Sequence, residues 1–381
     1  MCNKYELNQL QGFVAEPAAI SYIYYPLTPL DPQTKELVIK TLVMKKQIQA
    51  SLLLSALILF SCQKQDSLQT VTENARAASQ SPSLGKAMLK EKCASHIVLE
   101  QQMKLDPGRA QYLDKLEAAT KNYKRAKAPA EAVKYIPVVV HVVLTNSSIV
   151  SDDLIQSQLD VLNYDYNAQN QELKGNPYLA GFMKENAGNL GVRFVLAQTV
   201  RVNTKQTSFA LNDGVKMSAR GGSDAIDPGS KLNIWVCDLG EIYLGYAQFP
   251  GGKEWSDGVV LDYRAFGIGR KAGYPYFADY ALGRTATHEI GHWMNLYHIW
   301  GSRYCGTDYV DDTPQHDSPN YYCPEKGHLS ACAPGILEQW MNYMDYSDDA
   351  CLYLFTRGQQ FRMEAAAAEA RAAYLYNSNS F

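Results

Sequence analysis

The chain has 381 residues, of which 46% are hydrophobic and 20% are charged. This length and composition suit one large globular domain or two modest ones. The formal net charge of −3 and the isoelectric point of about 6.2 exclude the strongly basic character of proteins that bind nucleic acids or broad membrane surfaces.

The segment from Met44 to Ser61 has the pattern of an export signal. Two lysines follow Met44, an apolar run covers residues 50–60, and the small residue Ser61 ends the segment. The run is too short to span a bilayer, which requires about 20 apolar residues. We therefore predict a signal peptide over residues 44–61.

Cys62 follows this segment directly. A cysteine at the cleavage point resembles the acylated cysteine of Bacteroidetes-type lipoproteins. We therefore expect a lipid on Cys62 that anchors the exported protein to the bacterial outer membrane, on its periplasmic or its outer face, with release after processing left open. An ordinary signal peptide followed by a chance cysteine is the alternative.

Three further segments precede the predicted catalytic region. Residues 1–43 lie before an export signal, so we expect them to be untranslated or unstructured, with the true start at Met44. Residues 62–84 are rich in Ser, Gln, Thr and Ala and are expected to form a flexible tether. Residues 85–133 are expected to form a helical pro-segment, whose basic linker at 125–131 is the expected cleavage zone. The apolar residues available for one face of its helix are Leu99, Met103, Leu113 and Leu116.

Residues 134–381 alternate between strand and helix patterns at first and then become irregular. The β-branched run 137–144 predicts a buried strand. Ser151 can cap a helix whose apolar residues keep helical spacing, namely Ile155, Leu159, Leu162 and Tyr166. A capping box at Thr356 and Gln359 opens a last helix that is expected to reach about Tyr374. Further strands are expected at 192–196, 232–236, 243–248 and 259–263.

The segment 284–296 is expected to be a helix that carries a zinc-binding motif. His288 and His292 are four residues apart, so they lie one turn apart on one helical face and can both reach one zinc ion. Glu289 lies beside them, is not needed as a ligand, and can act as general base for the attacking water.

A third histidine, His298, follows His292 by six residues. A straight helix would carry it to another face, so the chain must turn sharply between the two. Asn295 lies in the gap and tolerates the left-handed conformation that can end the helix. Three histidine ligands leave the fourth zinc position open, which is typical of a catalytic site.

This motif resembles that of the metzincin zinc peptidases. Residues 134–365 are similar to one branch of them, the pappalysin/cytophagalysin family M43, although metzincins more often have Gly in place of Asn295. The segments that carry the resemblance are 136–143, 244–252, 257–266 and 342–349.

The resemblance implies an α+β metzincin fold with substrate in a cleft between two subdomains. The upper subdomain reaches to about residue 298 and holds the zinc helix and a twisted, mostly parallel five-stranded sheet. The lower subdomain, 299–381, is small, irregular and stapled by disulfides, and ends in a C-terminal helix.

The resemblance also implies roles beyond the zinc motif. Met344 would lie in a tight turn beneath the metal and pack against the zinc site. The alternative is an ordinary core methionine, which would have much the same packing role. The hydroxyl of Tyr346 would hydrogen-bond the oxyanion of the transition state, with a packing tyrosine as the alternative. A calcium site is implied in the loop that follows the zinc motif, and a solvated acidic loop is its alternative. Its candidate ligands are Asp308, Asp311, Thr313 and also Asp312.

The eight cysteines include four that cluster after the zinc motif. Four cysteines allow three pairings, and the sequence alone does not choose between them. The family resemblance implies Cys305–Cys332 and Cys323–Cys351, which require an oxidising compartment. Cys237 lies in an apolar strand pattern and is expected to be a buried free thiol.

Cys93 lies in the predicted pro-segment and has no partner in this scheme. A thiolate is a strong zinc ligand, so one supplied from the pro-segment would take the open fourth position. This resembles the cysteine switch of zymogens. An incidental or dimer-forming thiol is the alternative.

The sequence therefore predicts a secreted zinc-dependent endopeptidase that hydrolyses peptide bonds of proteins and is made as a zymogen. Its partners would be protein or peptide substrates, one of which could pair as an added strand with residues 244–248. Asp348 and Asp349 could favour a basic substrate residue after the cut. We expect no nucleic-acid partner and no membrane contact except through the lipid. The alternative is a catalytically silent surface adhesin on the same scaffold, against which Glu289 argues.

Overall fold

The computed structural model describes residues 92–123, 133–175, 186–240, 242–269, 273–324 and 328–377. All of them lie within one unit of the chain, Arg76–Phe381. The predicted signal peptide 44–61, its Cys62, the tether 62–84, residues 1–43 and the linker 125–131 lie outside the described residues. Within the described part, no helix is both long enough and apolar enough to cross a membrane.

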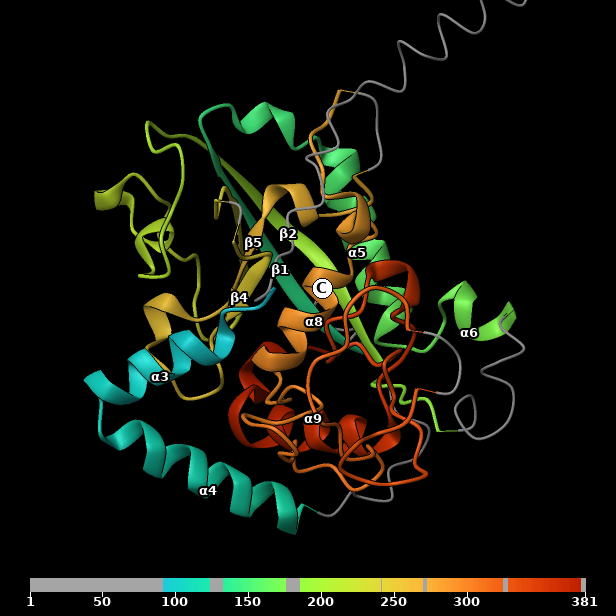
Figure 1. Ribbon diagram of the computed structural model, residues 1–381. Helices are drawn as coiled ribbons and strands as arrows, with labels where there is room; N and C mark the ends of the chain where they lie inside the picture. Colours follow the sequence, from blue (N-terminus) through green and yellow to red (C-terminus); the bar gives the residue numbers. More distant parts are fainter. Residues whose placement is uncertain are drawn as a thin grey trace, which may run out of the picture. The chain divides into compact units, whose positions relative to one another are not determined.

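Five strands form one sheet in the order β2-β1-β3-β5-β4 (Figure 1). Strand β1 is parallel to β2 and β3, and β3 is parallel to β5, whereas the edge strand β4 is antiparallel to β5. The predicted five-stranded, mostly parallel sheet is therefore confirmed. The strands are β1 Lys134–Leu144, β2 Val192–Asn203, β3 Leu232–Cys237, β4 Gly245–Ala247 and β5 Val259–Asp262.

The strands differ in length from the sequence prediction, by one residue in β3 and β5 and by more in the others. β1 begins at Lys134, three residues before its predicted start. β2 continues to Asn203, seven residues beyond its predicted end, because it pairs with β1 along its whole length as an edge strand. Polar residues of an edge strand face solvent, so no apolar run marks this extension. β4 is limited to Gly245–Ala247, three residues of the six predicted.

One face of the sheet is covered by helices α5 (Asp152–Asp165) and α8 (Arg284–Trp293). Ser151 caps α5, since its Oγ accepts a hydrogen bond from the backbone N–H of Leu154 at 3.2 Å. The core on this face joins alternate residues of β1 to both helices. Its members include Val138, Val140, Val142, Ile155, Leu159, Leu162, Ala286, Ile290 and Trp293.

The other face of the sheet packs against a loop region and against the predicted pro-segment. Trp235 and Tyr246 lie at the centre of this second core. Ala94 and Val98, which precede the catalytic domain in the chain, complete it. The predicted pro-segment therefore shares a hydrophobic core with the predicted catalytic domain that follows it in the chain.

Helix α8 ends at Trp293, three residues before its predicted end. Asn295 then adopts the expected left-handed conformation, with φ of +71°. The backbone N–H of Leu296 donates to the carbonyl of Gly291 at 2.9 Å, which is the long bond of a Schellman motif. This motif reverses the chain and brings it back toward the helix.

The region after residue 298 is irregular and holds two disulfides, Cys305–Cys332 and Cys323–Cys351. Cys237 is a buried free thiol. Helix α9 (Arg357–Ala370) begins with the predicted capping box at Thr356, but it ends before Tyr374. A 3₁₀ turn at Ala372–Tyr374 takes the place of its last predicted turn.

The pro-segment forms two helices, α3 (Ser95–Leu105) and α4 (Gly108–Asn122), where the sequence pattern predicted continuous helix. The break falls at Asp106, whose φ of −134° and ψ of 99° are extended. Pro107 explains it, because proline disfavours helical geometry in the residue before it. Leu99 and Leu116 are buried as expected, whereas Met103 and Leu113 are half-buried.

The remaining described elements are short. One is helix α6 (Gln171–Gly175). The others are 3₁₀ turns at Ser147–Ile149, Gly214–Lys216, Ser218–Arg220, Glu254–Ser256, Tyr263–Ala265, Ala278–Tyr280 and Asp349–Cys351.

Candidate active site

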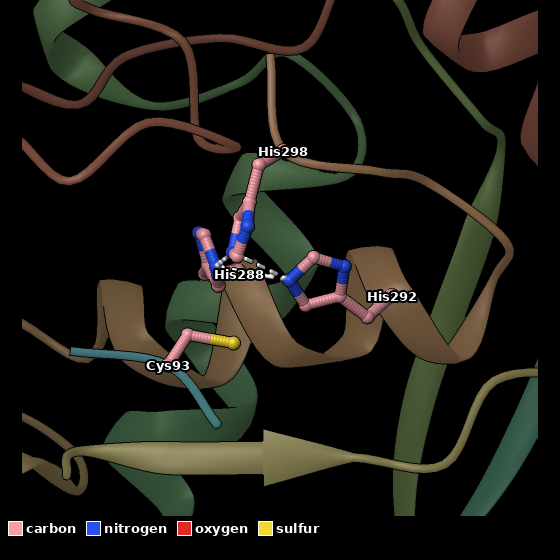
Figure 2. Close-up of side chains that lie close together, drawn as sticks. All are labelled: Cys93, His288, His292 and His298. Carbon is pink, nitrogen blue, oxygen red and sulfur yellow. Dashed lines mark hydrogen bonds between the residues drawn. The ribbon is translucent and has the colours of Figure 1, made fainter. Parts of the chain in front are cut away.

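Three histidine side chains meet at one point beside α8 (Figure 2). The Nε2 atoms of His288, His292 and His298 lie 3.1 Å from one another in each of the three pairs. All three residues are buried. His288 and His292 lie on α8, and the turn at Asn295 supplies His298 from the chain that follows.

Hydrogen bonds at the opposite ring nitrogens fix two of these rings. Nδ1 of His288 lies 2.7 Å from the carbonyl of Tyr343, and Nδ1 of His292 lies 2.7 Å from the carbonyl of Leu296. A carbonyl can only accept, so we assign the ring protons to Nδ1 and the lone pairs to Nε2. Burial lowers the pKa of His288 to about 4 and lowers the pKa of both other histidines well below the usual value. The rings are therefore neutral, as metal ligands must be.

This donor set fits a zinc ion. Converging lone pairs repel one another unless a cation lies between them. Tetrahedral zinc with bonds of about 2.0–2.1 Å places its nitrogen ligands about 3.3 Å apart. The observed separation of 3.1 Å is close to that value.

Met344 forms part of the floor beneath the histidines and is fully buried. A Cβ added to Gly291, which lies between His288 and His292 in the sequence, would be 2.5 Å from the Met344 sulfur. The thioether therefore packs directly against the backbone of α8. The side chain of Asn342 accepts a hydrogen bond from the Met344 N–H at 2.9 Å, which stabilises the tight turn.

Glu289 is buried beside the histidines and faces the pro-segment. Its Oε2 accepts hydrogen bonds from the Ser95 hydroxyl at 2.7 Å and from the Cys93 thiol at 3.4 Å. Its Oε1 has no hydrogen-bond partner among the described residues. Burial raises the pKa of Glu289 to about 8.

Tyr346 contacts the same site from the lower subdomain. Its ring lies against those of His298 and Trp300, with centroids 4.9 and 4.7 Å away. Its hydroxyl donates to the carbonyl oxygen of Cys93 at 3.2 Å. The hydroxyl is thus close to the histidines and is engaged by the pro-segment backbone.

Cys93 completes a group of four metal-binding side chains. Its sulfur and the three Nε2 atoms all lie within 4.8 Å of one another, and Figure 2 shows the sulfur pointing toward the histidines. Burial raises the pKa of the Cys93 thiol well above its usual value. A bound metal ion would deprotonate such a thiol.

The backbone around Cys93 pairs with the edge of the sheet. The N–H of Leu244 donates to the carbonyl of Lys92 at 2.7 Å, and the N–H of Ala94 donates to the carbonyl of Gly245 at 3.0 Å. Cys93 and Gly245 form a parallel bridge. The strand edge at 244–248, where we predicted an added substrate strand, is therefore taken by the chain's own pro-segment.

Comparisons with known proteins agree with this geometry. The family model described as pregnancy-associated plasma protein-A, of peptidase family M43, matches residues 274–368. Extracellular metalloprotease 1 of Coccidioides posadasii is 32% identical over 249 residues, which cover 65% of this chain and 80% of the relative. The chain belongs to peptidase family M43. It is a zinc metalloendopeptidase, and the alternative of a silent adhesin finds no support.

Solved structures of mirolysin from Tannerella forsythia are similar to this M43 peptidase. A promirolysin mutant is 36% identical, with a TM-score of 0.65, over 74% of this chain and 97% of that one. Mature mirolysin in complex with a cleaved peptide is 40% identical, with a TM-score of 0.55, over 62% of this chain and 92% of that one. The predicted metzincin fold is thereby confirmed.

Sequence reasoning missed Lys92 in this M43 peptidase. Its ammonium group is buried, lies 3.7 Å from Asp348 and 4.2 Å from the centre of the Tyr280 ring, and donates to the carbonyl of Tyr346. Burial lowers the pKa of Lys92 to about 8. The only available signal was its position beside Cys93, since nothing else distinguishes it from other lysines of the pro-segment.

The predicted calcium ligands of the M43 peptidase enter two separate hydrogen-bond groups. Asp312 accepts from the Thr356 hydroxyl at 2.6 Å and from the Gly358 N–H at 2.8 Å, at the start of α9. Both oxygens of Asp308 accept from the Thr313 hydroxyl at 2.9 Å. Among the described residues, the carboxylates of this loop do not converge as the four zinc-site ligands do. The calcium site stays a prediction.

Proposed function

We propose that this chain is an exported zinc endopeptidase that is made as a latent precursor and that Cys93 silences. The observation that carries the proposal is the position of the Cys93 sulfur within the three-histidine group. A cysteine that served only packing would have no reason to lie among three converging imidazoles. Export is supported by the relative's description as an extracellular metalloprotease.

Each side chain of the site has a role in this proposal. His288, His292 and His298 hold the zinc ion, which when bound supplies a Lewis acid that polarises the scissile carbonyl. Glu289 takes a proton from the attacking water and passes it to the leaving amine.

Two residues of the lower subdomain support this chemistry. The Tyr346 hydroxyl donates to the oxyanion once the pro-segment has left, because its ring already lies against His298. Met344 holds the floor of the site by packing on α8.

Latency follows from contacts that the pro-segment makes with the zinc position, Glu289, the Tyr346 hydroxyl and the strand edge. Cys93 offers a thiolate to the zinc position, and the Ser95 hydroxyl occupies the carboxylate of Glu289. Its carbonyl oxygen occupies the Tyr346 hydroxyl. Residues 92–94 cover the strand edge that a substrate would need. Removal of the segment frees all of these groups at once.

The pocket that holds Lys92 indicates the substrate class. It offers the carboxylate of Asp348, the ring of Tyr280 and a backbone carbonyl to a buried ammonium group. We infer that it accepts a lysine or arginine side chain of a protein substrate, whose backbone pairs with β4. The cleaved peptide bound to mature mirolysin supports binding of peptides in this cleft.

The division of the chain into segments is supported by the sequence pattern alone. We propose a signal peptide at 44–61, a lipid on Cys62, a tether at 62–84, a pro-segment at 85–133 and a catalytic domain from 134. Incorporation of a labelled fatty acid into wild type but not into Cys62→Ser would support the anchor. Equal incorporation in both would eliminate it.

The function is tested with a peptide library and linker-cleaved protein from which the pro-segment has been removed. We expect hydrolysis that stops with a zinc-selective chelator, returns with added zinc, and favours Lys or Arg beside the cut. Asp348→Asn should weaken this preference through KM more than through kcat, because the carboxylate binds the substrate side chain and does not touch the reacting atoms. Hydrolysis that survives complete zinc removal would overturn the proposal. A preference for apolar residues that Asp348→Asn leaves unchanged would overturn the assignment of the pocket.

A further inference from the structure

Helix α4 of the pro-segment is fastened to the catalytic domain by contacts that do not involve the histidines. Arg109 is buried and donates from Nη2 to the carbonyl of Phe249 at 2.7 Å and from Nη1 to the carbonyl of Pro250. Gln102, at the end of α3, donates to the side chain of Gln248 at 3.2 Å. The pro-segment thus bonds to three consecutive residues of one loop.

The next residue of that loop leaves space for a pro-segment ring. Gly251 has a φ of +82°, and a Cβ added there would lie 2.0 Å from a ring carbon of Tyr112. Only glycine combines that backbone conformation with such a close approach. The aromatic ring of α4 therefore fits directly against the loop backbone.

The second half of α4 contacts α9 (Figure 1). Glu117 and Arg362 form an ion pair with 2.8 Å between Oε2 and Nη2, and the side chains are only 20% and 2% exposed. Arg362 lies over the rings of Tyr297 and Tyr309, 5.1 and 5.7 Å from their centres. It also donates to the carbonyl of Asn295 at 2.7 Å. The catalytic domain itself therefore holds this guanidinium in place.

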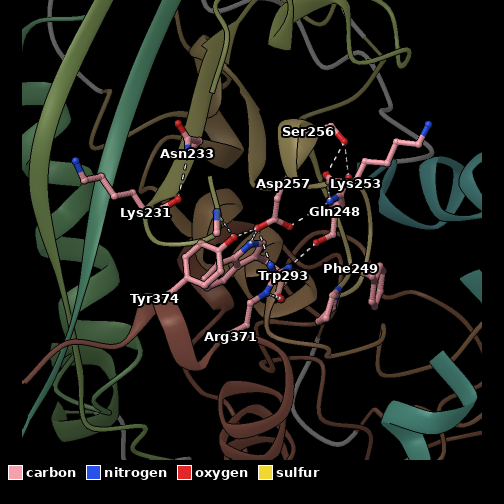
Figure 3. Close-up of polar contacts among 12 residues, drawn as sticks. Lys231, Asn233, Gln248, Phe249, Lys253, Ser256, Asp257, Trp293, Arg371 and Tyr374 are labelled. Carbon is pink, nitrogen blue, oxygen red and sulfur yellow. Dashed lines mark hydrogen bonds and ion pairs between the residues drawn. The ribbon is translucent and has the colours of Figure 1, made fainter. Parts of the chain in front are cut away.

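The loop 248–251 is also held by other parts of the catalytic domain (Figure 3). Asp257 lies at the centre of this arrangement and is buried. Arg371 additionally donates to the carbonyl of Gln248 at 3.3 Å. The loop is thus tied to α8 and to the end of α9 without help from the pro-segment. The side chains that donate to Asp257 are Gln248, Trp293, Arg371 and Tyr374.

We propose that the α4 anchor surface, formed by residues 248–251 with Tyr297, Tyr309 and Arg362, binds the pro-segment independently of the metal. After cleavage of the linker, residues 92–123 then stay on the catalytic domain as a noncovalent inhibitor. Cleavage within 124–132 removes none of the contacts described above. Full activation therefore requires a further cut within α3 or α4, or slow dissociation. The claim that the bound segment inhibits rests on the proposed function, whereas the claim that it stays bound does not.

The test uses the full chain with a recognition site for a sequence-specific protease placed within residues 125–131. Cys93→Ala removes the thiol, and the cut protein is passed over a gel-filtration column with and without a zinc chelator. We expect the N-terminal fragment to co-elute with the catalytic domain in both conditions. Adding Glu117→Gln should weaken fragment binding on the order of tenfold or more, since it removes the carboxylate that pairs with the buried guanidinium of Arg362. Asp114→Asn is the matched control, because it removes one charge from the exposed side of the same helix.

Two results would overturn the anchor. One is loss of the fragment from Cys93→Ala as soon as the linker is cut. The other is equal fragment binding by Glu117→Gln and Asp114→Asn. Tyr112→Ala, measured in the same way, provides a second route that leaves every charge in place, and unchanged binding there would likewise contradict the fit at Gly251. A catalytic domain that binds the fragment but stays inactive after the fragment has been removed would refute only the proposed function.

Discussion

The sulfur of Cys93 lies 3.4 Å from Oε2 of Glu289, on a carboxylate oxygen that also accepts the Ser95 hydroxyl at 2.7 Å. The proposed pro-segment therefore contacts the proposed general base as well as the metal position. An inhibitory segment that only filled the metal position would leave this carboxylate free. Here two nearby residues of the segment, Cys93 and Ser95, engage both.

The first prediction concerns the base itself. Glu289→Gln should lower kcat/KM of the cleaved enzyme by at least about 10³-fold, since it removes the proton acceptor and keeps the side-chain shape. Zinc content, measured by elemental analysis, should stay the same because Glu289 is not a ligand. Glu369→Gln, an exposed change on α9, serves as control. Retained hydrolysis in a zinc-replete Glu289→Gln enzyme would contradict the assignment of Glu289 as general base.

Tyr346→Phe separates an oxyanion role from packing. Loss of one preorganised donor should lower kcat by roughly 10²–10³-fold and leave KM nearly unchanged. The ring contacts with His298 and Trp300 do not depend on the hydroxyl, so the melting temperature should change little. Tyr304→Phe, at a residue that is 69% exposed, is the matched control. A kcat equal to that of wild type would leave only packing for Tyr346.

The two disulfides should matter for stability in the lower subdomain. They close loops with sequence separations of 27 and 28 residues, and each should contribute roughly 3–4 kcal/mol in the chain-entropy model. The double variant Cys323→Ser/Cys351→Ser should therefore show a lower free energy of unfolding in denaturant titration. Peptide mapping of exported protein that finds the four cysteines free would contradict the pairing.

The buried carboxyl of Asp308 makes stability depend on pH. Burial raises its pKa to about 7, whereas the unfolded chain has a value of about 3.9. The folded state thus binds more protons between these values, so the contribution of Asp308 is fully present below about pH 4 and is lost as the pH rises to about 7. The melting temperature should fall less from pH 5 to pH 8 in Asp308→Asn than in wild type.

Calcium gives this experiment a second arm. A cation at Asp308 would stabilise the ionised carboxylate, so added calcium should raise the melting temperature of wild type at pH 7.5 but not that of Asp308→Asn. Parallel pH curves for the two proteins would contradict the Asp308 effect. A wild-type melting curve that responds to neither calcium nor its chelator would remove the calcium site.

The zinc motif was predictable because its geometry is local. The spacing of His288 and His292 on one helical face and the left-handed turn at Asn295 follow from backbone rules that need no tertiary information. The start of α5 at Ser151 and the capping box of α9 could be predicted for the same reason. Pro107 could also have predicted the break between α3 and α4, but the helical spacing of the leucines indicated one continuous helix.

The remaining features depend on long-range packing, which a single sequence does not show. Lys92 differs from other lysines only because the fold places Asp348 beside it, 256 positions further along the chain. Asp312 looked like a calcium ligand, and its role at the start of α9 depends on a contact with Thr356. The length of β2 depends on β1, which it follows to the end.

The central claim is that Cys93 keeps a competent zinc peptidase silent, and precursor activity before any cleavage tests it most directly. Wild type and Cys93→Ala are compared as intact chains, without reducing agent, on a short fluorogenic peptide, and integrity is checked by mass spectrometry at the end of each assay. The account predicts no measurable hydrolysis by the wild-type precursor and clear hydrolysis, or faster self-cleavage, by Cys93→Ala. Equal activity in the two intact chains would contradict it.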